Sequence, residues 1–255
     1  MSLEMFSLAG KRALITGSSR GIGLALARGL GKAGAAIVLN ARNDALLAVA
    51  QERLQAEGIT VTRHACDVTD PDAVELMVGL VEANDGPIDI LINNAGMQHR
   101  AALEEFPRDV FDDLMRLNVN AAFYVGQAVA RRMIPRKSGK IINICSLMTF
   151  LARQSITPYT ASKGAIAALT RGMAADWARH GININGIAPG YFKTELNEAL
   201  WSDPEFSTWL EQRTPMQRWG DLEELVGAAI FLASGASTFV NGHILTVDGG
   251  ISASV

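Results

Sequence analysis

Short apolar runs of strand length alternate with longer helical patterns along almost the whole of this 255-residue chain. Residues 12–16 form the first such run, residues 21–33 repeat their apolar side chains at helical spacing, and residues 36–40 form the second run. Parallel strands need crossover connections, which are usually helical and almost always right-handed. The alternation therefore predicts one doubly wound α/β domain over residues 1–255, with a parallel sheet and helices on both of its faces.

We expect strands at residues 12–16, 36–40, 59–66, 88–92, 140–144, 182–187 and 244–247, and helices at 21–33, 44–57, from about 70, 108–133, 158–180 and 221–233. Asn43 can cap the second helix and Gly58 can end it in a left-handed turn. Asp70 and Pro71 are a typical cap and first-turn pair for the third helix. Residues 191–220 interrupt the alternation, are rich in polar side chains and hold three of the four tryptophans. We expect this segment to be either a mobile lid over a site or a small satellite core.

Composition and charge exclude several classes of protein. With 49% hydrophobic residues the chain is not disordered, and a net charge of −3 gives no reason to expect nucleic acid or an anionic membrane as a partner. Residues 1–10 lack the apolar core of a secretory signal, and residues 225–247 are charge-free but interrupted by polar residues and glycines. Cys66, Cys145 and the four histidines lack metal-ligand spacing, which predicts reduced thiols, no metal and a cytoplasmic protein.

The sequence TGSSRGIG at residues 16–23 directly follows the first predicted strand and opens the first predicted helix. Its three glycines permit a tight turn and a close approach of the backbone to a ligand, and the free amides at a helix start suit a pyrophosphate. A glycine cluster placed between a strand and a helix predicts a dinucleotide site.

Three motifs together resemble the classical short-chain dehydrogenase/reductase family: the glycines at positions 17, 21 and 23, the sequence Asn93-Asn94-Ala95-Gly96, and the pattern Tyr159-x-x-x-Lys163. The resemblance covers nearly the whole chain. It implies a Rossmann sheet of seven strands in the order 3-2-1-4-5-6-7, with ligands bound where the strand order reverses between strands 1 and 4. It also implies which residues bind the dinucleotide. These are Gly17, Ser19, Arg20, Gly21, Ile22, Gly23, Arg42, Asp67, Val68, Asn93, Ala95, Gly96, Tyr159, Lys163, Pro189, Gly190 and Thr194.

The end of the second predicted strand indicates which dinucleotide binds. NAD users place a carboxylate there that accepts hydrogen bonds from the ribose hydroxyls, whereas this chain has Asn40-Ala41-Arg42. No carboxylate would repel a 2′-phosphate, and Arg42 and Arg20 could both pair with one, so we expect NADP and regard NAD as the less favoured cofactor. Arg42 could otherwise be a solvated loop arginine, and Asp67 an ordinary turn residue.

Tyr159 and Lys163 lie four residues apart and therefore share one face of a predicted helix. A free phenol is only about a thousandth ionised at pH 7, and a nearby ammonium and the positive start of the helix both favour the phenolate. The family resemblance implies that Ser146 hydrogen-bonds the substrate oxygen, that Tyr159 transfers its proton, and that Asn118 bends a helix and keeps a water beside Lys163. Asn120 is the alternative candidate for the role that the resemblance gives to Asn118. These residues imply hydride transfer between a nicotinamide and a carbinol carbon.

Within this family, residues 96–100, 131–136, 143–146 and 213–215 are similar to the gluconate 5-dehydrogenases, which interconvert D-gluconate and 5-dehydro-D-gluconate. The resemblance implies a sugar-acid substrate. A carboxylate favours a fixed guanidinium, and Arg100 and Arg153 lie on loops that border the expected nicotinamide site. We expect both arginines, with Ser146 and Tyr159, to contact substrate, although either arginine could be a plain loop cation.

Two other functions stay open at this stage. A 3-oxoacyl thioester reductase that acts on carrier-protein substrates could use the basic run of Arg131, Arg132, Arg136 and Lys137, which could instead simply stabilise the end of its own helix. An NADP-binding regulator would keep the fold without chemistry. The resemblance further implies a homotetramer of 222 symmetry, and the small residues in the predicted helices 108–133 and 158–180 permit close helix packing.

Overall fold

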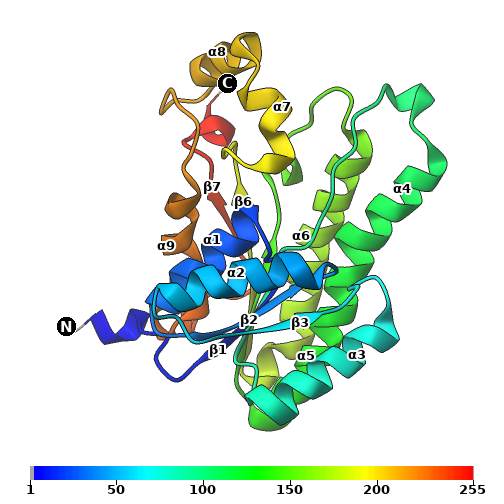
Figure 1. Ribbon diagram of the computed structural model, residues 1–255. Coiled ribbons are helices and arrows are strands. Elements are labelled where there is room, and N and C mark those ends of the chain that lie inside the picture. Colours follow the sequence, from blue (N-terminus) through cyan, green and yellow to red (C-terminus); the bar gives the residue numbers. More distant parts are fainter. Residues whose placement is uncertain (1–2, 255) are drawn as a thin grey trace.

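The computed structural model describes residues 3–254 and contains a seven-stranded parallel sheet in the order β3-β2-β1-β4-β5-β6-β7 (Figure 1). The predicted fold class and strand order are therefore confirmed. The strands are β1 (Arg12–Thr16), β2 (Ala36–Ala41), β3 (Val61–Ala65), β4 (Ile90–Asn93), β5 (Gly139–Ile144), β6 (Ile182–Pro189) and β7 (Ile244–Val247). The α-helices are α1 (Gly21–Lys32), α2 (Asp44–Ala56), α3 (Pro71–Leu80), α4 (Arg108–Met115), α5 (Ala121–Arg136), α6 (Thr157–Trp177), α7 (Glu198–Trp201), α8 (Pro204–Arg213) and α9 (Val226–Ala233).

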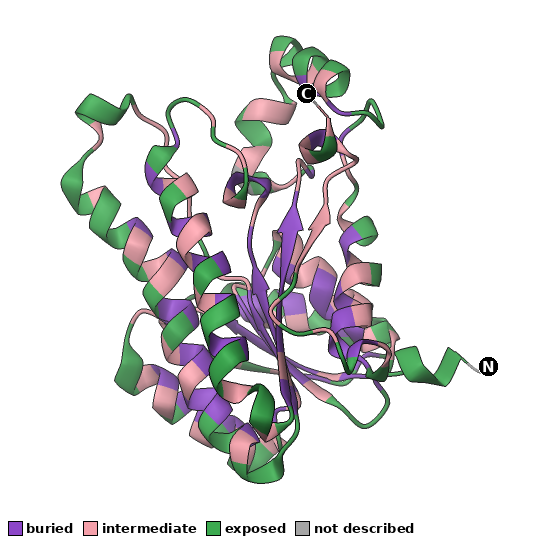
Figure 2. Cartoon of the chain, turned by 180° about the vertical axis from the view of Figure 1, so that it is seen from behind, coloured by how far each residue is buried: buried purple, intermediate pink, exposed green. Residues whose placement is uncertain are grey.

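Helices cover both faces of the sheet (Figure 1). On one face α1, α2 and α9 bury side chains such as Leu26, Leu54 and Leu232 against the strands. On the other face α3, α5 and α6 bury side chains such as Met77 and Val125. All four residues of β4 are buried, as expected for a parallel strand covered on both sides. The edge strand β7 is only half-buried along its length (Figure 2).

The predicted helix signals set the ends of α2 and α3. The side chain of Asn43 accepts a hydrogen bond from the amide of Leu46 at 3.1 Å, and Gly58 has a φ of +79° just after α2 ends. The side chain of Asp70 accepts two amide hydrogen bonds at the start of α3, where Pro71 is the first helical residue. These signals confirm the sequence-based prediction of both caps.

Several elements differ from the prediction. The helix expected at residues 221–233 begins as a 3-10 turn, η8 (Leu222–Leu225), before α9. The single helix expected at residues 108–133 is divided by a π-helical turn, η4 (Arg116–Asn120), into α4 and α5. π-helical turns are rare and occur often at functional sites, and Asn118 lies in this one. The third strand is shorter than expected because the amide of Ile59 bonds to the carbonyl of Leu54 at 3.1 Å, as part of the end of α2.

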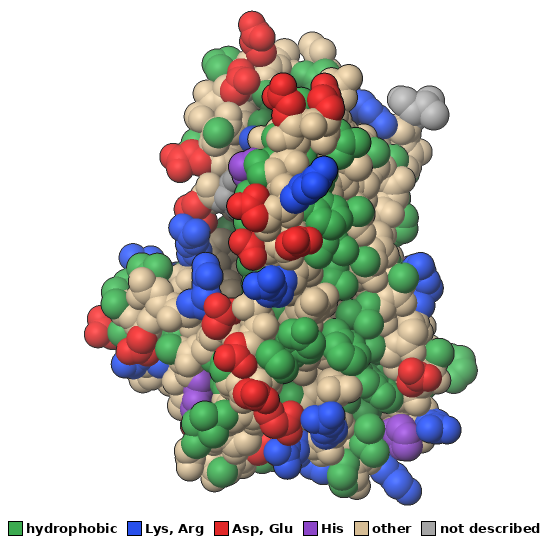
Figure 3. Space-filling view, turned by 90° about the vertical axis from the view of Figure 1, so that its right-hand side faces the viewer, with side chains coloured by type: hydrophobic (Ala, Val, Ile, Leu, Met, Phe, Trp, Pro, Cys, Tyr) green, Lys and Arg blue, Asp and Glu red, His purple; other side chains and the backbone are tan. Residues whose placement is uncertain are grey.

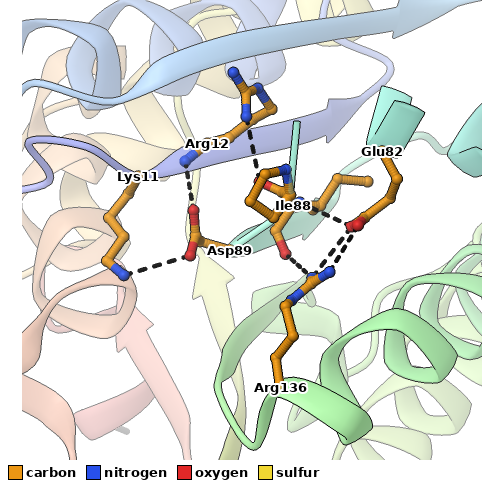
Figure 4. Close-up of polar contacts among 7 residues, drawn as sticks. Lys11, Arg12, Glu82, Ile88, Asp89 and Arg136 are labelled. Carbon is orange, nitrogen blue, oxygen red and sulfur yellow. Dashed lines mark hydrogen bonds and ion pairs between the residues drawn. The ribbon is translucent and has the colours of Figure 1, made fainter. Parts of the chain in front are cut away.

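A cluster of polar contacts fixes the amino ends of the central strands (Figure 4). Asp89, just before β4, accepts hydrogen bonds from the backbone amide of Arg12 at 3.0 Å and from Nζ of Lys11 at 3.3 Å. Arg136, at the end of α5, donates to both carboxylate oxygens of Glu82 and to the carbonyl of Ile88. The last cation of α5 is therefore already paired at this end of the sheet.

Residues 191–220 pass over the carboxyl ends of the strands (Figure 1). Leu210 and Trp219 are buried in a separate apolar cluster with Leu147, Ile156 and Ile251. The segment thus forms the expected satellite core, while its first part lines the cleft described below. Its mobility as a lid stays a prediction. Among the described residues, no helix combines the length and the apolar character needed to span a bilayer.

Candidate active site

A cleft of about 350 Å³ opens at the carboxyl ends of the strands and is lined by residues from Gly17 to Leu200. It lies where the strand order reverses between β1 and β4, the position at which open parallel sheets bind ligands. Figure 3, seen from the side of α4, shows a hollow in the surface with basic and acidic side chains along its rim.

The glycine-rich loop lines this cleft, and no side chain fits in place of two of its glycines. A Cβ on Gly23 would lie 2.5 Å from the carbonyl oxygen of Gly17, and a Cβ on Gly17 would lie 2.8 Å from Cα of Ala95. Asn94 ties the loop to the next strand, since its Nδ2 donates to the carbonyls of Thr16 at 2.9 Å and Gly17 at 3.0 Å. The loop is therefore held rigidly against the loop that follows β4.

The start of α1 fits a pyrophosphate. Arg20, at the N-cap position, makes no side-chain capping hydrogen bond, so no side chain of this residue occupies the first amides of the helix. Gly21 has a φ of +56°, and a Cβ there would meet only the carboxylate of Glu195, 3.5 Å away. Uncapped helix amides can donate hydrogen bonds to a diphosphate, and a glycine beside them leaves room for it.

The end of β2 contributes no carboxylate to the cleft. Asn40 is buried there, and its Nδ2 donates to the carbonyls of His64 and Cys66. Arg42 is 75% exposed, and its guanidinium lies 4.0 Å from Asp67. Burial would raise the pKa of Asp67, but hydrogen bonds from Thr69 and the charge of Arg42 outweigh it and lower that pKa. An exposed pair at this distance is worth less than about 1 kcal/mol, so Arg42 is available to a phosphate.

Tyr159, Lys163 and Ser146 line the same cleft. Nζ of Lys163 lies 5.6 Å from the centroid of the Tyr159 ring and donates to the carbonyl of Ile144 at 2.8 Å. Ser146 follows β5, and its Oγ accepts a hydrogen bond from the amide of Met148 at 3.1 Å, which leaves its hydroxyl hydrogen free to donate. The arrangement places a phenol, an ammonium and a hydroxyl around one space.

Two of the expected site residues lie behind the cleft and do not line it. Asn93 is buried, and its Nδ2 donates to Asn143 at 2.9 Å and to the carbonyl of Ala122 at 3.3 Å. Asn118 is also buried, and its side chain bonds to both backbone groups of Met97 and to Oγ of Ser162. Both asparagines hold the walls of the cleft in place. All other residues proposed from the sequence line the cleft: Gly17, Ser19, Arg20, Gly21, Ile22, Gly23, Arg42, Asp67, Val68, Ala95, Gly96, Arg100, Ser146, Arg153, Tyr159, Lys163, Pro189, Gly190 and Thr194.

One corner of the cleft is strongly basic. Arg100 and Arg153 both line it, and Nε of each is buried without a hydrogen-bond partner. Neither guanidinium has an ion pair with an acidic residue in the described part of the chain. Burial and the charge of Arg153 lower the pKa of Arg100, and burial raises the pKa of Tyr191, which lies beside them. Two neighbouring guanidinium groups without an acidic partner in residues 3–254 suit a carboxylate ligand.

The sequence-based prediction missed Asn94, Tyr191 and Glu195, which also line the cleft. Asn94 stands inside the motif that was singled out and could have been chosen there in place of Asn93. Tyr191 and Glu195 carry no local signal, because only the path of residues 191–220 over the strands brings them to the cleft. In residues 3–254, no group of three or more His, Cys, Asp or Glu side chains is arranged to hold a metal ion.

Comparison with known proteins assigns the family. Residues 17–252 match the family model described as enoyl-(acyl carrier protein) reductase. The chain is 61% identical over 252 residues to gluconate 5-dehydrogenase of Gluconobacter oxydans (strain 621H), a match that covers 99% of this chain and 98% of that protein. The chain belongs to the short-chain dehydrogenase/reductase family.

Two further matches agree with this assignment. The chain is 52% identical to 5-keto-D-gluconate 5-reductase of Escherichia coli (strain K12), over 99% of both chains. It also resembles the crystal structure of a gluconate 5-dehydrogenase from Burkholderia cenocepacia J2315 in complex with NADP and tartrate, with a TM-score of 0.98, 56% identity and full coverage of both chains. The protein is accordingly an oxidoreductase of this family, which disfavours a role as a regulator without chemistry.

Proposed function

We propose that this protein is an NADP-dependent gluconate 5-dehydrogenase that interconverts D-gluconate and 5-dehydro-D-gluconate. The observation that carries the proposal is the pair of arginines, Arg100 and Arg153, whose buried Nε atoms have no hydrogen-bond partner and which line the same cleft as Tyr159 and Ser146. A sugar acid has a carboxylate at one end and secondary hydroxyls along its chain. It therefore matches a cleft that offers positive charge at one place and a proton-transfer group at another.

NADP is the cofactor that the residues fit best. The uncapped start of α1 and the open face of Gly21 would hold the pyrophosphate, while Arg20 and Arg42 would pair with the 2′-phosphate. When bound, the nicotinamide accepts or returns a hydride at its C4 atom. The known complex of the Burkholderia cenocepacia protein with NADP supports this choice.

The side chains of the cleft would handle the proton that accompanies the hydride. Ser146 donates a hydrogen bond to the reacting oxygen and holds it against the Tyr159 oxygen, which takes up the hydroxyl proton as a phenolate during oxidation and returns it as a phenol during reduction. The positive charge of Lys163, near the Tyr159 ring, stabilises the phenolate that this step requires. Loss of the proton and of the hydride converts the secondary alcohol to a ketone.

The geometry disfavours the carrier-protein alternative. Arg131 and Arg132 both pair with Glu75, at 3.3 and 3.6 Å. Arg136 pairs with Glu82 at 2.6 Å (Figure 4). This basic run also lies at the amino ends of the strands, at the opposite end of the sheet from the cleft. An acidic partner bound there would not bring its substrate to Tyr159.

We also propose the homotetramer implied by the family resemblance. The edge strand β7 is half-buried along its length, Phe239 in the connection before it is fully exposed, and Phe123 on α5 is 40% exposed. Apolar groups exposed beside an edge strand and on a helix favour association. Light scattering should give four times the monomer mass, and a monomer at all concentrations would contradict this assembly.

A steady-state assay tests the proposed function. NADPH oxidation should require 5-dehydro-D-gluconate, should be slower with NADH, and should be undetectable with an acetoacetyl thioester. Arg42→Ala should raise the KM for NADPH about 10- to 100-fold, the value of a charge-assisted hydrogen bond, with little change for NADH. Arg53→Ala, which removes an exposed arginine outside the cleft, is the matched control. Reduction of the thioester in place of the keto acid would overturn the proposal.

A further inference from the structure

Arg153 connects the cleft to the segment above it. Its guanidinium carbon lies 5.3 Å from the ring centroid of Phe206, which belongs to α8. The Phe206 ring in turn contacts the rings of Tyr191, Trp209 and Trp219, with centroids 5.8, 5.3 and 6.2 Å away. The Arg153 side chain therefore lies in the basic corner of the cleft and also contacts the aromatic cluster of residues 191–220.

The same guanidinium lies near a second positive charge, that of Arg100. Arg100 and Arg153 repel each other across a half-buried corner, and each has a buried Nε without a partner. Like charges in partly desolvated surroundings are costly until an anion lies between them. A carboxylate bound there would remove the repulsion and leave Arg153 in one orientation, with its cationic face on the Phe206 ring.

We propose that the carboxylate of the substrate, bound between Arg100 and Arg153, fixes Arg153 against Phe206 and thereby holds α8 over the cleft. Phe206 is then a positioning residue, and the charge of the sugar acid orders the segment that covers the reacting carbon. The inference rests on the proposed function and specifies how that site distinguishes acids from neutral polyols.

A neutral analogue makes the inference testable. D-Glucitol has the carbon chain and the C5 hydroxyl of D-gluconate, with a hydroxymethyl group in place of the carboxylate. It can reach Tyr159 but cannot neutralise the two arginines. Because three of the four tryptophans lie in residues 191–220, tryptophan fluorescence reports the state of that segment.

The first measurement is a fluorescence titration of the Tyr159→Phe variant saturated with NADP⁺, in which ligand binds without turnover. D-Gluconate should change the tryptophan emission and D-glucitol should not. Adding Phe206→Leu should abolish the response to D-gluconate, while adding Phe206→Tyr, which keeps an aromatic face, should preserve it. An equal response to both polyols, or a full response with Phe206→Leu, would overturn the inference.

The second measurement is the turnover of D-gluconate with otherwise unchanged protein. Phe206→Leu should lower kcat about 3- to 30-fold, the factor that corresponds to a half-buried cation–π contact, with a smaller change in KM. Phe150→Leu, three residues before Arg153 and 53% exposed, is the matched control and should leave kcat unchanged. A normal kcat for Phe206→Leu would refute the proposed coupling of Arg153 to α8 and would leave the proposed function unaffected. Absence of any D-gluconate oxidation by the unaltered protein would refute the proposed function instead.

Discussion

Replacing Asn118 by alanine should cost stability and catalysis together. The Asn118 side chain accepts a hydrogen bond from the amide of Met97 at 2.8 Å and donates to the carbonyl of Met97 and to Oγ of Ser162, both at 3.0 Å. Ser162 lies between Tyr159 and Lys163 on α6 and donates to the carbonyl of Tyr159 at 2.7 Å. Asn118 therefore connects the loop after β4 to the turn of α6 that carries the proposed catalytic pair.

The magnitude follows from these three hydrogen bonds. Each contributes a net of about 0.5–1.5 kcal/mol, and an unpaired buried group costs more. Ser162 is fully buried, whereas Met97 is half-exposed at the cleft, so water can replace part of what Met97 loses. We therefore expect Asn118→Ala to lower the free energy of unfolding by about 2–3 kcal/mol, and Tm by about 4–12 °C for a chain of this size.

Urea denaturation and steady-state kinetics test this expectation. kcat should fall at least tenfold, because a small displacement of the phenol is enough to slow proton transfer. Asn120→Ala is the matched control, since Asn120 is two residues away in the same π-helical turn but exposed, and it should stay within about 0.5 kcal/mol of the unaltered protein. Equal losses for the two variants would refute the reasoning and reopen the choice between these asparagines.

Three further perturbations test other parts of the structure. Tyr159→Phe should reduce turnover by a factor of about a thousand while NADPH affinity, measured by calorimetry, changes less than threefold; substantial residual turnover would contradict the proposed role. Gly23→Ala should abolish NADPH binding because its Cβ would lie 2.5 Å from a backbone oxygen, whereas Gly79→Ala in α3, with nothing within 4 Å, should bind normally. Burial lowers the pKa of Lys140 from 10.5 to about 8, so its charged form destabilises the folded state below pH 8 and this cost disappears as the pH rises to 10.5. Lys140→Met should therefore be more stable than the unaltered protein by about 1–2 kcal/mol at pH 7, discounted for partial exposure, and denaturation at pH 10.5 should show that advantage lost.

Most of the fold could be predicted because its signals are local. Strand-length apolar runs, the caps at Asn43 and Asp70, and the left-handed turn at Gly58 depend only on neighbouring residues. The local pattern did not predict the π-helical turn η4, although the family resemblance implied that Asn118 bends a helix. This turn coincides with the hydrogen bonds of Asn118 to Met97 and Ser162, which lie 21 and 44 residues away in the sequence.

Only part of the candidate site could be predicted from the sequence. The glycine loop and the pair of Tyr159 and Lys163 are short motifs in fixed positions relative to a strand or helix, so the sequence alone was enough to assign both to one site. Asn93 and Asn94 are both polar and adjacent, and no local pattern separates them. Asn93 is the last residue of β4 and bonds to the buried Asn143, whereas Asn94 follows the strand and lies at the cleft. The position of Phe206 beneath the Arg153 guanidinium depends on the path of a long connection, which no local pattern encodes.

The cleft is complete only after most of the chain has been synthesised. Its residues run from Gly17 to Leu200, so about four-fifths of the sequence must be synthesised and folded before a nucleotide can bind with full affinity. A ligand that binds only the completed protein stabilises it by about 2.7 kcal/mol at a hundred times its Kd. Dinucleotide bound in the completed cleft would therefore shift newly made chains toward the folded state.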